Sequence, residues 1–204
     1  MTYNTLADLV KRGAGERELQ SFMKENLSLL GEACTPSSIV GEYIAFSEYR
    51  IIDGKGDFVV FTDRSRMVVV IIEVKGADFN FMNADGSINA NINEAARQVR
   101  ERYRTIENNY ELFRRSFHDV GRDVESGKTI FNSHIGSNGH LLVDPNKEIW
   151  LKGMVIGGRT TDEYLVSKER HTLEKESQRI SFDTWDSWVK NNGKYGDTLR
   201  LHNV

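Results

Sequence analysis

DFVVFTDRSRMVVVIIEVK, residues 57–75, carries the strongest indication of the fold in this chain. Two apolar runs rich in β-branched residues, 58–61 and 67–74, are joined by a polar turn. This pattern predicts a β-hairpin whose second strand is the more apolar of the two. The polar residues at the open end of the hairpin are the unusual feature of the stretch.

Charged residues gather at that open end. Asp57 opens the first strand, and the second strand ends with Glu73 and Lys75 on either side of Val74. Because successive strand side chains point to opposite faces, Glu73 and Lys75 share a face. The sequence therefore predicts two carboxylates and an ammonium at one end of an apolar sheet.

These charges need compensation, because removing an unpaired charge from water is costly. One explanation is a salt bridge between Lys75 and one of the two acids, with the other acid solvated. The other is a divalent metal held by Asp57 and Glu73, since hard cations such as Mg²⁺ prefer oxygen ligands. Such a metal can generate hydroxide and stabilise charge on a phosphate, while Lys75 positions the water or neutralises the developing charge.

An acid followed by E-x-K at the end of an apolar strand resembles the PD-(D/E)XK nuclease superfamily, with Gly56 in place of the proline. The flanking segments ELQSFMKENLSLLG, SEYRIIDGKGDFVVF, IIEVKGAD and KGMVIGGR extend the resemblance. In this order they resemble the nuclease domain of Shedu-type anti-phage defence proteins over roughly residues 16–190. The resemblance implies an α/β fold with a restriction-endonuclease-like (PD-(D/E)XK) core, in which helices flank a central mixed β-sheet.

The resemblance also implies an activity, a Mg²⁺- or Mn²⁺-dependent endonuclease that hydrolyses DNA in anti-phage defence. Asp57 and Glu73 then bind the metal, with the backbone carbonyl of Val74 as a further ligand, and Lys75 acts on the water and the phosphate. On the helix after E-x-K, Gln98 completes the site by holding the water or a phosphate oxygen. An acid on the first helix often faces the metal in related nucleases, which leaves Glu16 and Glu18 as alternatives.

Composition is that of an ordinary globular protein, with 39% hydrophobic and 28% charged residues. The length of 204 residues suits one domain, 1–204, with a loop-rich insertion near 118–147. No apolar run is long enough to span a membrane and the N-terminus does not resemble a signal peptide, so we expect a cytoplasmic protein. The net charge of −3 does not indicate DNA binding, although a nuclease needs only a local basic surface.

Hydrophobic periodicity and turn residues predict the other elements. Helices are expected over 16–30, ending at Gly31, over 95–117, capped by Asn91 or Asn93, over 162–176, and from Asp183 or Thr184 onward; strands over 41–52, 149–156 and 179–182; loops over 33–40 and 76–93; and a turn at 53–56.

Several residues have a structural and a functional explanation. The arginines of the long helix, Arg102 among them, are expected mostly on a solvated face. The tryptophans Trp185 and Trp188 are expected in the core or at a dimer interface. Arg159 is expected to meet a phosphate or a neighbouring acid. Cys34 is expected to be a buried apolar residue.

Two other functions are compatible with the same sequence. A nuclease-fold module that binds nucleic acid without cutting it would keep the polar cluster as structural ion pairs. A DNA-repair nuclease would use the same chemistry in another setting. A double-strand break usually requires two active sites, so a homo-oligomer is plausible.

Overall fold

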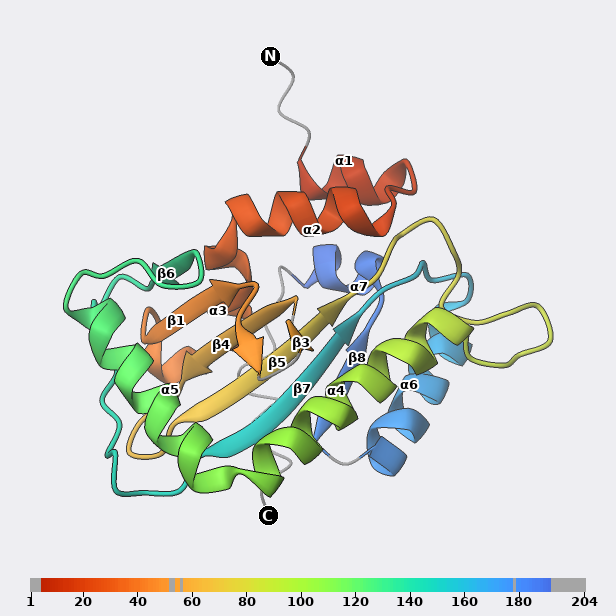
Figure 1. Cartoon of the computed structure of the whole chain (residues 1–204). Helices are drawn as coiled ribbons and strands as arrows, with labels where there is room; N and C mark the ends of the chain where they lie inside the picture. Colours follow the sequence, from red (N-terminus) through yellow and green to blue (C-terminus); the bar gives the residue numbers. More distant parts are fainter. Residues whose placement is uncertain (1–4, 52–53, 56, 178, 192–204) are drawn as a thin grey trace.

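A mixed six-stranded sheet with helices on both faces forms the centre of the molecule (Figure 1). The computed structural model describes residues 5–51, 54–55, 57–177 and 179–191. The strand order is β6-β1-β4-β5-β7-β8, and a separate two-stranded sheet pairs β2 with β3. The α/β class and the central mixed sheet flanked by helices are confirmed.

The elements have the following bounds. The helices are α1 (Leu6–Lys11), α2 (Glu16–Glu25), α3 (Leu27–Cys34), the 3₁₀-helix η1 (Ser37–Ile39), α4 (Ala90–Asn108), α5 (Tyr110–Glu125), α6 (Glu163–Ser177) and α7 (Trp185–Lys190). The strands are β1 (Tyr43–Ser47), β2 (Arg50–Ile51), β3 (Gly54–Lys55), β4 (Phe58–Thr62), β5 (Val68–Val74), β6 (Ser133–Ile135), β7 (Trp150–Ile156) and β8 (Ile180–Asp183).

The predicted hairpin is the antiparallel pair β4–β5, in which Phe58 lies opposite Ile72. On the other side of β5, β7 and then β8 run parallel to it. Parallel neighbours need crossovers, which α4 with α5 and then α6 provide. Every residue of β5 is buried, because this strand has a hydrogen-bonded neighbour on each side and helices over both faces.

Side chains alternate along β5 into two hydrophobic cores. Val69 and Ile71 belong to the core under α4 and α5, whereas Val70 and Ile72 belong to the core shared with α1, α2, α3 and α7 (Figure 1). Trp185 and Trp188 lie in the second core, as does Cys34. Of the two explanations for the tryptophans, packing in the core is the one observed.

Both long helices predicted from periodicity are in fact interrupted by an asparagine. Asn26 separates α2 from α3, and Asn109 separates α4 from α5. Each has φ −129° and donates its side-chain amide to the carbonyl four residues earlier, that of Phe22 or Thr105. A side chain that bonds the backbone in this way competes with the helical ladder. Gly31 was wrongly predicted as a helix end, since it lies inside α3.

The predicted strand 41–52 is in fact two strands, β1 (Tyr43–Ser47) and β2 (Arg50–Ile51), with a break at 48–49. Glu48 has φ 62°, a left-handed conformation that ends β1, and its side chain pairs with Lys24. β2 then pairs with β3, where a turn over 53–56 was expected. Residue 52 of the predicted strand and residues 53 and 56 of the predicted turn lie outside the described residues.

The predicted loop-rich region 118–147 is partly helical. α5 continues to Glu125, and it carries the buried residue His118. β6 then adds an edge strand to β1. Upstream, the N-cap of α4 is Asn89, whose side chain accepts from the Asn91 amide, so the predicted caps are two or more residues late.

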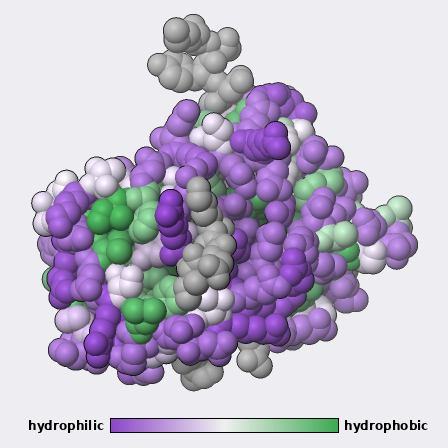
Figure 2. Space-filling view, in the orientation of Figure 1, coloured by the Kyte–Doolittle hydropathy of each residue, from purple (hydrophilic) through white to green (hydrophobic). Residues whose placement is uncertain are grey.

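The face drawn in Figure 2 is mostly hydrophilic, with separate hydrophobic patches. Large exposed apolar side chains include Val40, Leu112, Leu142, Tyr164 and Leu165. Among the helices of the described residues, none has both the length and the apolar character needed to cross a bilayer.

We predict that Gly157→Ala destabilises the protein by about 1–3 kcal/mol, because the added methyl overpacks the end of β5. A Cβ at this position would lie 2.7 Å from the Lys75 Cβ and 3.1 Å from the Ile92 Cδ1. Urea unfolding measures the change. Gly121→Ala is the matched control, since its Cβ would lie 3.9 Å from its nearest neighbour, the Met67 Cε, and alanine favours a helix. Equal stability of wild type and Gly157→Ala would contradict the packing argument.

Candidate active site

Asp57 lies next to the end of β5, as the hairpin predicted. It directly precedes β4, and the pairing of Phe58 with Ile72 places it opposite Glu73. Its Oδ2 accepts a hydrogen bond of 3.0 Å from the Val74 amide. The half-buried Asp57 carboxylate is therefore oriented by the backbone of β5.

Glu73 is the one charged residue of β5, and its side chain is only 3% exposed. Its Oε1 lies 2.6 Å from the Arg102 Nη1, close enough to pair as charges but without the alignment of a hydrogen bond. Burial and then the charge of Asp57 raise the pKa of Glu73 to about 8, while Arg102 and Lys75 act in the opposite direction. The charge of Asp57 thus contributes directly to the raised pKa of Glu73.

Lys75 follows the last residue of β5, and its ammonium reaches α2. Its Nζ lies 3.4 Å from the Glu16 carboxylate oxygens. Glu18, two residues after Glu16 on α2, pairs with Arg12 instead. Of the two alternatives Glu16 and Glu18, both on α2, Glu16 is the one beside the predicted site. The alternative of a salt bridge between Lys75 and Asp57 or Glu73 is wrong, because Lys75 pairs with Glu16.

Backbone contacts fix this end of the strand. The Trp185 indole donates a 2.7 Å hydrogen bond to the Lys75 carbonyl. The Ala77 amide donates to the Ala14 carbonyl at 2.8 Å, which ties the exit from β5 to the residues just before α2. Lys75 and Glu16 are therefore brought together by main-chain contacts as well as by charge.

Gln98 lies on the face of α4 that crosses the end of β5. Four residues before it, Glu94 is near enough to Lys75 that the ammonium contributes, after Arg97, to lowering the pKa of Glu94. Four residues after it, Arg102 contacts Glu73. Gln98 therefore lies between these two contacts, donates its amide to Glu94 Oε1 at 3.4 Å, and has a buried Oε1 without a hydrogen-bond partner among the described residues.

Arg102 is the residue of this cluster that sequence reasoning missed. We expected it on a solvated face, yet its side chain is only 14% exposed. Its position four residues after Gln98 was the available signal, because residues i and i+4 share a helix face. Arg159, in contrast, pairs with Asp186 at 2.9 Å and donates to the Val10 carbonyl, so a neighbouring acid is its observed partner.

The cluster offers oxygen ligands suited to a hard cation. Asp57 and Glu73 carry two adjacent carboxylates, and Gln98 Oε1 is a buried acceptor that has no hydrogen-bond donor among the described residues. Within the described part of the chain, no group of three or more His, Cys, Asp or Glu residues is placed to hold a metal. A cation here would complete its shell with backbone carbonyl oxygen or water, which Mg²⁺ commonly retains. The role of the Val74 carbonyl stays a prediction.

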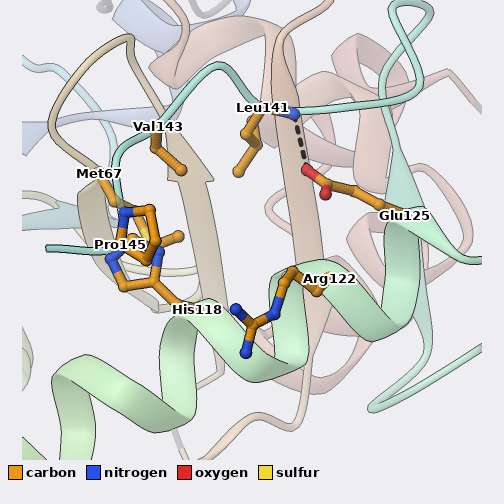
Figure 3. Close-up of a pocket in the computed structure, with 8 residues that line it drawn as sticks. Met67, His118, Arg122, Glu125, Leu141, Val143 and Pro145 are labelled. Carbon is orange, nitrogen blue, oxygen red and sulfur yellow. Dashed lines mark hydrogen bonds between the residues drawn. The ribbon is translucent and has the colours of Figure 1, made fainter.

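A separate hollow lies near the opposite end of β5. This cavity of about 80 Å³ is lined by α5 and the loop around Leu141, with Met67 behind them (Figure 3). The buried His118 Nε2 has no hydrogen-bond partner within the described residues, and Glu125 accepts from the Leu141 amide at 2.7 Å. None of the predicted site residues lines the cavity.

Comparison with known proteins places the chain in a family. The family model described as Shedu protein SduA, C-terminal, matches residues 13–189. The chain belongs to this family. Its membership implies a context of anti-phage defence, and the matched region of the Shedu family contains all the predicted site residues. No curated protein and no solved structure matches the chain.

We predict that Glu73 makes stability depend on pH in this Shedu-family chain. Because its pKa in the folded state is raised from 4.5 to about 8, the native state binds more protons than the unfolded state between these values. The free energy of unfolding therefore falls as pH rises from about 5 to 8, by an amount on the order of a few kcal/mol. Glu73→Gln, which cannot ionise, removes the part of this dependence that comes from Glu73 and leaves the part from Asp183, whose pKa burial raises to about 7.

Urea unfolding in EDTA across this pH range measures the effect. Glu101→Gln serves as the control, since Glu101 lies at an exposed position of α4. Parallel pH profiles for wild type and Glu73→Gln would show that Glu73 ionises in the folded protein as it does in the unfolded chain.

Proposed function

We propose that this Shedu-family protein is a metal-dependent nuclease that hydrolyses DNA phosphodiester bonds in defence against phage. The proposal includes a restriction-endonuclease-like (PD-(D/E)XK) core. The observation that carries it is the meeting of Asp57 and Glu73 at the end of a buried strand, with Lys75 beyond them. A buried carboxylate beside a half-buried one is costly unless a cation offsets the charge.

Asp57 and Glu73 would hold Mg²⁺ or Mn²⁺, with the Val74 carbonyl and water as further ligands. A cation bound there supplies a hydroxide at neutral pH and stabilises charge on the phosphate. Asp57 is oriented for this task by the Val74 amide, and Glu73 is fixed by its place in β5.

The remaining residues act on the substrate and the water. Lys75, whose side chain is 13% exposed, offers its ammonium to the negative charge that develops on the phosphate, and Glu16 holds it at this edge of the sheet. Gln98 has an amide oxygen that no described residue hydrogen-bonds, with which it can orient a water molecule. Each polar side chain of the cluster then has a function that its position allows.

A second candidate is a nucleic-acid-binding module without turnover. The pairs Glu73–Arg102 and Lys75–Glu16 favour it, because they already compensate two of the charges. DNA binding by such a module would fall steeply with salt and would not require a divalent cation.

Calorimetric titration with MgCl₂ separates the two functions. We expect wild type to bind Mg²⁺ and to nick or linearise plasmid DNA, whereas Asp57→Asn and Glu73→Gln lose both properties. Lys75→Met should retain Mg²⁺ and lose at least about 100-fold in rate. Wild type that binds no Mg²⁺ and cuts neither DNA nor RNA with Mg²⁺ or Mn²⁺ would falsify the nuclease proposal. Size-exclusion chromatography beside the plasmid assay tests the predicted homo-oligomer.

Glu16 and Glu18 provide a matched pair, since both lie in the first turn of α2. We predict that Glu16→Gln lowers the cleavage rate about tenfold because Lys75 loses the group that orients it. Glu18→Gln should leave the rate unchanged, because Glu18 contacts only Arg12 among the ion pairs described. Single-turnover cleavage measures both variants, and equal rates for the two would rule out this role of Glu16.

A further inference from the structure

The ion pair between Glu73 and Arg102 is poorly explained as a source of stability. Glu73 is the one charge in a strand that otherwise contains only Val and Ile. Arg102 extends to it from α4, among the buried residues Val99, Tyr103 and Ile106. Buried ion pairs of this kind can usually be replaced by apolar residues without loss of stability. The pair therefore suggests a function that requires a charged carboxylate at Glu73, held in a fixed orientation.

The two acids at the end of β5 are fixed by different groups. Asp57 accepts from the Val74 amide at 3.0 Å, so the backbone of the sheet orients its carboxylate. Glu73 has its Oε1 2.6 Å from the Arg102 guanidinium. Because two neighbouring carboxylates repel each other, each needs a group that holds it toward the other.

Arg102 is well placed to act as such a group. α4 packs against both β5 and β7, and Tyr103, next to Arg102, donates a 3.1 Å hydrogen bond from its hydroxyl to the Arg179 carbonyl. The guanidinium is thus presented by a helix that is itself fixed to the sheet. Carboxylates that bind metals are commonly held by a second group in this way, and removing that group weakens metal binding.

We propose that Arg102 is a positioning residue, which holds the Glu73 carboxylate in the orientation in which Glu73 and Asp57 bind a divalent cation together. The inference rests on the proposed metal-dependent function and deepens it. An ionised carboxylate has about four acceptor sites, so the contact of Glu73 Oε1 with Arg102 leaves the carboxylate able to bind a further ligand. Arg102 does not touch the substrate in this role.

Calorimetry with MgCl₂ on the full chain tests the role of Arg102. Arg102→Gln should weaken Mg²⁺ binding about 10- to 100-fold, and Arg102→Lys, which keeps the charge but lacks the planar fork, should lose less than Arg102→Gln but still several-fold. Arg104→Gln removes the same charge from an exposed position of the same helix and should bind as wild type. The shift of Tm on adding Mg²⁺ should decrease in the same order.

Equal or tighter Mg²⁺ binding by folded Arg102→Gln would overturn the inference, because it would mean that Arg102 is neutral or competes with the cation. Circular dichroism shows whether that variant folds; if it does not, wild-type affinity in Arg102→Lys overturns the inference instead. Absence of Mg²⁺ binding by wild type rejects the proposed function itself. The two failures are therefore distinguished by the wild-type titration.

Discussion

A buried carboxylate at the end of an apolar strand is the constraint on which the rest of the site depends. Glu73 belongs to β5, which lies in the middle of the sheet with helices over both faces, so water cannot compensate its charge. Arg102 from α4 and the proximity of Asp57 follow from this position. The elements around β5 therefore supply charge to the end of a strand that otherwise contains only Val and Ile.

The exit from β5 is fixed as firmly as the strand itself. Trp185 binds the Lys75 carbonyl, Gly157 leaves room for the Lys75 side chain, and Ala77 ties the next residues to the segment before α2. These contacts come from both hydrophobic cores, so the position of the lysine is decided by the packing of the whole sheet. A site of this kind needs its side chains held by rigid elements.

Membership of the Shedu family and the geometry of the cluster support the same proposal from different directions. The family match covers α2, the hairpin, α4 and all but the last residue of α7, which are the elements that supply the cluster and its supports. The cluster adds a chemical reason, since paired acids beside a lysine suit a divalent cation and a phosphate. Arg102 is assigned to the cluster only because it contacts Glu73.

The sequence by itself determined the hairpin, the common face of Glu73 and Lys75, the approach of Asp57 and the helix that carries Gln98, because these follow from strand and helix periods. Sequence periodicity did not reveal the helix breaks at Asn26 and Asn109, where a side chain bonds the backbone of its own helix. Which charged side chains contact each other depends on how the helices pack on the sheet. Lys75 pairs with Glu16 and Glu73 pairs with Arg102 because α2 and α4 cross the end of β5. Contacts between elements far apart in the chain are set by packing rather than by local sequence pattern.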